Sequence, residues 1–134
     1  MRELLSDCKV IDMHHGEVLG APLSAEAPNQ CLSRKANTLK TITTRLALLN
    51  RHDGHALLRC SLGHPRITYD LRAAPCFASA MGLTAVDNSL REAFPKSGCV
   101  ALDDASWKRA TLPPTMGGIG LQSATDMELP QFLA

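Results

Sequence analysis

The fold of this 134-residue chain depends first on the stretch Asn29-Gln-Cys-Leu-Ser-Arg-Lys-Ala-Asn-Thr-Leu-Lys-Thr-Ile-Thr-Thr-Arg-Leu-Ala-Leu-Leu-Asn50. Its apolar residues recur at the spacing of one helical face, and they are Leu32, Leu39, Ile42, Leu46 and Leu49. Such a stripe has to be buried against other elements. The stretch therefore predicts one long amphipathic helix over about 29–50, with the core on one side of it.

Shorter helical patterns follow this stretch. They predict helices over about 56–62, about 65–73, about 83–94, around Trp107, and from a cap at Ser123 to Pro130. Pro75, Pro95 and Pro130 are expected to end helices, because proline has no N–H to donate. In the pattern over 83–94, the polar residues expected on the exposed side are Asp87, Arg91 and Glu92. Beyond Trp107, an apolar plug is expected from Trp107, Leu112, Ile119 and Leu121.

The N-terminal region has a different pattern. Apolar residues flank His14-His15-Gly16, which predicts a short β-hairpin. The expected fold is mainly α, a small helical bundle preceded by a short N-terminal β-hairpin. Residues 1–23 are expected to form the hairpin with its following turn, and residues 24–134 are expected to form the helical domain.

Composition points to an intracellular protein, nuclear or cytoplasmic, that does not enter a membrane. No apolar run approaches the roughly 18 residues of a membrane span, and acids lie where a secretory signal would have an apolar core. The five cysteines are scattered, so they are expected to be reduced and mostly buried.

Charge is unevenly distributed along the chain. The net charge is only +1, yet Arg34 to Arg72 contains eight bases and two acids. This asymmetry is typical of a surface that meets phosphates, although a solvated basic helix face gives the same pattern. The residues expected to contact phosphates are Arg34, Lys35, Lys40, Arg45 and Arg51.

Four motifs follow one another along the chain. They are Leu19-Gly-Ala-Pro22, Leu57-Leu-Arg-Cys60, the Arg-x-x-Tyr-x-x-Arg-x-x-Pro segment over 66–75, and the Trp-x-x-Ala-x-Leu-Pro-x-x-x-Gly-Gly-x-Gly-Leu segment over 107–121. In this order they resemble the region after the palm in reverse transcriptases of non-LTR, LINE-like retrotransposons. The resemblance covers almost the whole chain.

The resemblance implies a thumb that grips the template–primer duplex, of RNA or of RNA and DNA, during RNA-directed DNA synthesis. It also implies a primer-grip-like turn at Leu19, Gly20, Ala21 and Pro22. The other implied partner is the palm and fingers of the parent polymerase, and the chain is expected to be a fragment of such an element. The alternative is a stand-alone helical adaptor, derived from such an element, that binds an acidic protein.

Catalysis is expected to lie outside this chain. Palms of this type hold two divalent ions with three carboxylates, two of them from an Asp-Asp pair. The only such pair here is Asp103-Asp104, and no apolar strands flank it. One of these carboxylates is instead expected to cap the helix of Trp107. No catalytic residue and no cofactor are therefore expected, and Mg²⁺ is expected only in the missing palm.

A zinc module is a further alternative, because His52, His55, Cys60 and His64 lie close together in the sequence. The group lacks the Cys-x-x-Cys spacing of structural zinc sites, and a nearby glycine and proline interrupt the helix. The sequence therefore favours no metal site here.

Overall fold

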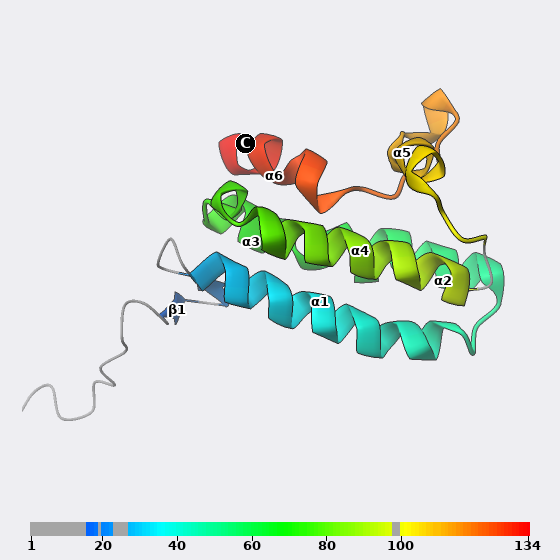
Figure 1. Ribbon diagram of the computed structural model, residues 1–134, viewed down its shortest axis with the longest axis horizontal. Coiled ribbons are helices and arrows are strands. Elements are labelled where there is room, and N and C mark those ends of the chain that lie inside the picture. Colours follow the sequence, from blue (N-terminus) through cyan, green and yellow to red (C-terminus); the bar gives the residue numbers. More distant parts are fainter. Residues whose placement is uncertain (1–15, 19, 23–26, 98–99) are drawn as a thin grey trace, which may run out of the picture.

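The computed structural model describes residues 16–18, 20–22, 27–97 and 100–134. Its described part is mainly α-helical, which confirms the predicted class (Figure 1). The helices are α1 (Ala27–Leu46), α2 (Arg51–Leu57), α3 (Thr68–Ala73), α4 (Ala80–Lys96), α5 (Asp104–Thr111) and α6 (Ala124–Leu133). Before them, β1 (Glu17–Val18) and β2 (Ala21–Pro22) pair as a short antiparallel hairpin.

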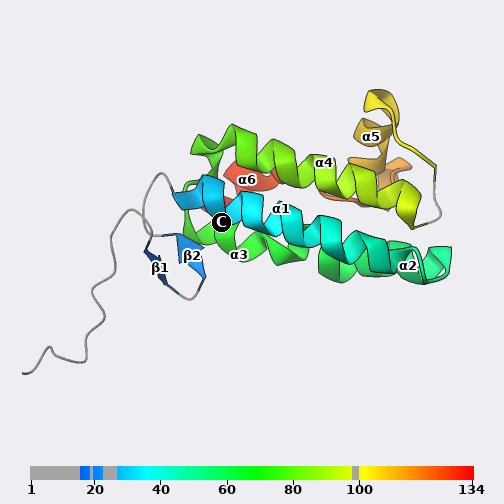
Figure 2. The same cartoon turned by 60° about the horizontal axis from the view of Figure 1, so that its bottom comes forward.

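The core lies between α1 and α4, which run side by side in the same direction (Figures 1 and 2). Leu32, Leu39 and Leu46 of α1 are buried there with Leu83 and Leu90 of α4. The segment from α2 to α3 runs back behind α4 in Figure 1 and below α1 in Figure 2, and α5 and α6 lie on the side of α4 away from α1 in Figure 1. Among the described residues, no helix is long and apolar enough to cross a membrane.

The stretch over residues 29–50 forms a helix that ends earlier than predicted. Helix α1 ends at Leu46, and Asn50 instead begins α2 by accepting a hydrogen bond from the backbone N–H of Asp53 at 2.9 Å. Leu49 therefore lies between the two helices and is 43% exposed, so its predicted place in the core is wrong. Ile42 is half-buried at the edge of the stripe.

The second and third helical patterns lie where they were predicted, with different detail. Helix α2 starts earlier than expected and continues as a π-helix over Leu58–Leu62. A 3₁₀ turn over His64–Arg66 then leads into α3. Ala74, before Pro75, is extended, as the expected stop at Pro75 requires.

Two prolines do not end their helices as predicted. Pro95 lies within the last turn of α4, and Pro130 lies inside α6, which continues to Leu133. Tertiary contacts hold the end of α6: the Phe132 ring lies edge-on to Phe77 with ring centroids 5.3 Å apart. These contacts offset the hydrogen bond that Pro130 cannot donate.

Asp87 is buried, which corrects the prediction that it is exposed on α4. Its carboxylate accepts hydrogen bonds from the N–H groups of Ala124 and Thr125, at 2.6 and 3.2 Å, and from the hydroxyls of Ser123 and Thr125. The carboxylate of α4 thus occupies the positive end of α6. The predicted cap is also confirmed, since Ser123 accepts a hydrogen bond from the N–H of Asp126.

The segment around Trp107 forms as predicted in its main features. Asp103 caps α5 by accepting the Ser106 N–H at 2.7 Å. Hydrogen bonding from the Ser106 side chain, and then from this N–H, lowers the pKa of the Asp103 carboxyl. At Gly118, a Cβ atom would lie 1.9 Å from the Leu112 carbonyl oxygen, so only glycine fits this turn. In the predicted apolar plug, Leu121 is buried while Trp107 and Ile119 pack partly buried on the core; Leu112, however, is 37% exposed.

Candidate nucleic-acid interface

One side of α1 faces away from the rest of the molecule. In Figure 2 this helix lies in front of the helices it packs on, and no other described element covers it. Arg34, Thr38, Thr41 and Arg45 recur there at helical spacing and are all exposed. A shallow open groove of about 800 Å³ follows this side, and its lining includes all four. We call this surface the outer face of α1.

Four of the five predicted phosphate contacts lie at the surface. Arg34, Lys40 and Arg45 are exposed on α1, and Arg51 is exposed at the start of α2. From Arg34 to Arg45 the helix rises about 16 Å, a distance over which a nucleic-acid strand would carry more than one phosphate. Among the described residues, Lys40, Arg45 and Arg51 form no ion pair with a carboxylate.

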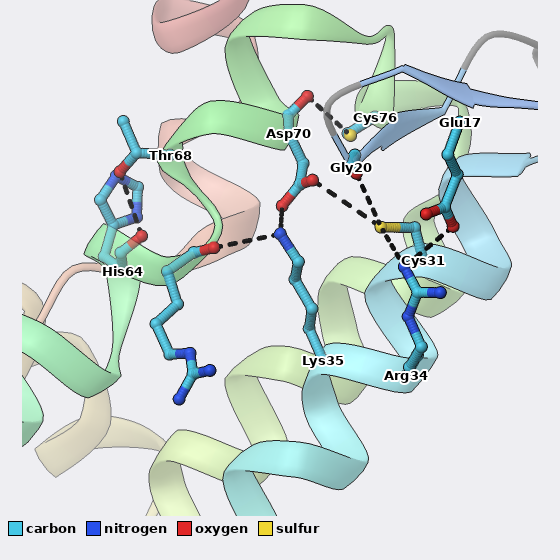
Figure 3. A network of polar contacts seen from close by, with 10 residues as sticks. Glu17, Gly20, Cys31, Arg34, Lys35, His64, Thr68, Asp70 and Cys76 are labelled. Atoms are coloured by element: carbon cyan, nitrogen blue, oxygen red, sulfur yellow. Dashed lines mark hydrogen bonds and ion pairs between the residues drawn. The ribbon is translucent and has the colours of Figure 1, made fainter.

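Lys35 is placed differently from the other four. Its ammonium group forms an ion pair with the carboxylate of Asp70, which is fully buried, and donates to the Arg66 carbonyl oxygen at 3.2 Å (Figure 3). The contact joins α1 to α3 and neutralises a buried charge. Contact with a phosphate would compete with this ion pair.

Two buried cysteines complete the surroundings of Asp70. The thiol of Cys31 lies 3.7 Å from the carboxylate, and that of Cys76 lies 3.4 Å from the carbonyl oxygen of Asp70. Burial raises the pKa of both thiols, for Cys76 to about 12. They are neutral small side chains, as predicted. Cys60 is exposed, and Cys8 and Cys99 lie outside the described residues.

The predicted primer-grip-like turn is the turn of the observed hairpin. Gly20 has φ +85°, a conformation that favours glycine, and nothing lies within 4 Å of where its Cβ would be. Ala21 and Pro22 are buried in β2, which packs on α1 and α3, and Leu19 lies outside the described residues. The predicted hairpin turn at His14-His15-Gly16 also lies mostly outside them. The described hairpin turns further along the chain.

This turn and the outer face of α1 meet at the start of the helix. The Cys31 sulfur lies 3.9 Å from the Gly20 carbonyl oxygen and 3.8 Å from Nη2 of Arg34. The same Arg34 nitrogen donates to Glu17 of β1 at 2.8 Å, a hydrogen bond that raises the pKa of the guanidinium group (Figure 3). Two separately predicted parts of the site are therefore neighbours. The sequence gives no signal for this, because the contacts join residues far apart in the chain.

The residues considered for metals are dispersed. In the part of the chain that the structure describes, no three His, Cys, Asp or Glu side chains gather as a metal site. His52 and Cys60 are exposed, while His64 is buried and neither of its ring nitrogens has a partner. Burial lowers the pKa of His64, which is therefore neutral. Asp104 pairs with Arg91 at 2.6 Å, and Asp103 is the helix cap described above.

Comparison of the chain with protein-family models, with curated proteins and with solved structures found no match.

Proposed function

We propose that this chain is a thumb-like domain that grips a template–primer duplex by its backbone. In this proposal it corresponds to the thumb region of a non-LTR retrotransposon reverse transcriptase, the family that its motifs resemble. The duplex would lie along the outer face of α1, and the Gly20 turn would approach one end of it. The domain would hold the duplex for a palm that performs the chemistry.

The observation that carries the proposal is a set of exposed cations: Arg45 on the outer face, Lys40 on the opposite edge of the exposed half of α1, and Arg51 at the start of α2. Lys40, Arg45 and Arg51 have no carboxylate partner among the described residues, so they are available to neutralise phosphates. Asn37, Thr38 and Thr41 lie between Arg34 and Arg45 along the groove. The amide of Asn37 is the available donor among them, because the two hydroxyls donate to the carbonyl oxygens of Arg34 and Asn37. Such groups commonly hydrogen-bond phosphate and sugar oxygens, which positions a duplex without reading its sequence.

The outer face is better suited to gripping the backbone of a duplex than to reading its bases. It carries no aromatic side chain among the residues that line its groove, so it offers no platform for stacking bases. A processive grip has to tolerate every sequence that is copied. Contacts to backbone and shape meet that need, as they do in proteins that bind A-form duplexes.

A salt titration tests the proposal. Binding of the chain to a labelled RNA–DNA hybrid of random sequence should weaken as salt rises, with a slope of about −3 to −4 in log affinity against log salt. The double variant Lys40→Ala, Arg45→Ala should make that slope shallower by about 2, because two phosphate contacts are lost. The charge-matched control is Lys96→Ala, Arg109→Ala, which removes two exposed cations that lie off the outer face.

A flat slope for the unmodified chain would reject duplex binding. If an acidic peptide then bound in its place, the adaptor alternative would be favoured. We also expect no primer extension by the chain with Mg²⁺, because Asp103 and Asp104 are engaged in a helix cap and an ion pair. Incorporation that is lost on changing both to Asn would contradict this.

A further inference from the structure

We infer that a second pocket, across α4 from α1, binds an unpaired nucleobase. The inference rests on the proposed function in taking the ligand to be part of a nucleic-acid strand. The pocket has a volume of about 290 Å³ and is formed where α4, α5 and the start of α6 meet. Its lining includes Asn88, Arg91, Trp107, Lys108, Thr125 and Asp126. Figure 1 shows α5 and α6 on the side of α4 away from α1, so this pocket is separate from the outer face.

The pocket contains the only tryptophan of the chain. Trp107 packs partly against the core and is also part of the pocket wall, so its ring is held in place while some of it stays accessible. A fixed aromatic surface is the usual platform on which an unpaired base stacks, a contact that depends little on which base is present. An ordinary core tryptophan would have no polar recess beside it.

Asn88 is an uncharged polar group of the pocket that is free to recognise the edge of a base. Its side chain is exposed and forms no hydrogen bond to any residue that the structure describes, which leaves two donors and an acceptor. Of the neighbouring groups, Thr125 donates its hydroxyl hydrogen to Asp87, and Arg91 donates to the Leu102 carbonyl oxygen and to Asp104. The charged ends of Lys108 and Asp126 form no hydrogen bond or ion pair with a residue that the structure describes. A free amide beside an aromatic ring matches the paired donors and acceptors of a base.

The charge and the volume of the pocket restrict further which ligands fit it. The pocket lining carries two cations, Arg91 and Lys108, and two carboxylates, Asp87 and Asp126. Its formal charges therefore balance, and the pocket favours a neutral planar group over a cluster of phosphates. Its volume is near the lower end of the roughly 300–1,000 Å³ found for small-molecule sites. This leaves room for a single nucleoside and excludes a base pair. An unpaired nucleotide at the end of a strand meets these requirements.

Tryptophan fluorescence tests the pocket directly, because Trp107 is the only tryptophan of the chain and can be excited at wavelengths that Tyr69 does not absorb. Adenosine monophosphate added to the full chain should quench this emission saturably. Asn88→Ala should weaken the apparent affinity by about fivefold or more, on the scale of a lost hydrogen bond to a base. Lys96→Ala, on the same helix but outside the pocket, should leave it unchanged. The absence of quenching in the unmodified chain, or equal quenching in Asn88→Ala, would overturn the inference.

A second measurement tests whether the base bound in the pocket belongs to a nucleic-acid strand. An RNA–DNA hybrid with a short 3′ adenine overhang should bind about fivefold or more tighter than its blunt counterpart, as expected for one stacked base. Asn88→Ala and Trp107→Leu should remove this advantage while blunt-duplex binding and its salt slope persist. Equal affinity for both hybrids in the unmodified chain would overturn the inference and leave the proposed function standing. Quenching by adenosine monophosphate without any duplex binding would support the pocket and reject the proposed function.

Discussion

At the scale of single residues, Lys35 and Lys40 show how position decides the role of a charge. They lie on the same helix, yet Lys40 is exposed while Lys35 reaches across to a buried carboxylate. At about 100° per residue, Lys35 falls within the apolar stripe, between Ile42 and Leu46, whereas Lys40 lies about 80° outside it, beyond Leu32. The sequence predicted both as phosphate contacts, because the partner Asp70 belongs to another helix and its approach depends on the tertiary fold.

The first prediction concerns this ion pair. Lys35→Ala should lower the free energy of unfolding by about 3 kcal/mol, since it leaves the Asp70 charge buried without a counter-ion. Lys40→Ala on the same helix should change it by no more than about 0.5 kcal/mol. Urea unfolding followed by circular dichroism measures both. The double variant Lys35→Met, Asp70→Leu should cost less than Lys35→Ala, and similar losses for Lys35→Ala and Lys40→Ala would contradict the structural role.

The second prediction concerns buried His64. Desolvation lowers its pKa in the folded chain, an effect partly opposed by Asp87, so the unfolded chain takes up a proton more readily. His64 therefore contributes to the stability of the folded chain at pH values above its pKa in the unfolded chain, about 6.5. This contribution is lost as the pH falls below that value. Burial lowers the pKa of His55 in the same sense. Urea unfolding at pH 7.5 and pH 5.5 should show this loss, and His64→Phe should reduce it; an unchanged pH dependence in that variant would rule His64 out.

At the scale of elements, the helices were predictable where periodicity and caps agree. The stripe of α1, the Asp103 cap of α5 and the Ser123 cap of α6 depend on neighbours in sequence, and all three are present in the structure. Helix ends were less predictable at Pro95 and Pro130, because a missing hydrogen bond is offset by contacts from distant segments. The burial of Asp87 also could not be predicted, because its hydrogen-bond partners belong to a distant segment, the start of α6.

The third prediction concerns the attachment of α6 to α4 through Asp87. Asp87→Ala removes a carboxylate that accepts from two backbone N–H groups and two hydroxyls of α6, and should cost about 2 to 3 kcal/mol. Hydrogen exchange should then accelerate in α6 while α1 and α4 keep most of their protection. Glu92→Ala, an exposed acid on the same helix, is the control. Unchanged exchange in α6 would show that its apolar contacts alone hold it.

At the scale of the whole molecule, the core and the proposed interface use opposite sides of one helix. Leu32, Leu39 and Leu46 are buried against the remaining helices, while Arg34 and Arg45 stay on the outer face. This division follows from the helical period and could be predicted from the sequence. The meeting of the Gly20 turn with Arg34, and the pocket beside Trp107, could not, because each joins segments that only the packed bundle brings together.

The last prediction uses the two sides of α1 to separate effects on stability from effects on binding. Leu46→Ala should cost about 2 to 5 kcal/mol of unfolding free energy through the cavity it leaves in the core, yet the folded variant keeps every cation of the outer face. Its salt slope on an RNA–DNA hybrid should therefore equal that of the unmodified chain when measured well below its melting temperature. Lys40→Ala, Arg45→Ala should do the reverse, with little effect on melting and a slope shallower by about 2. If Leu46→Ala flattened the slope while still folded, binding would depend on the packing of α1, and a row of independent phosphate contacts would no longer explain it.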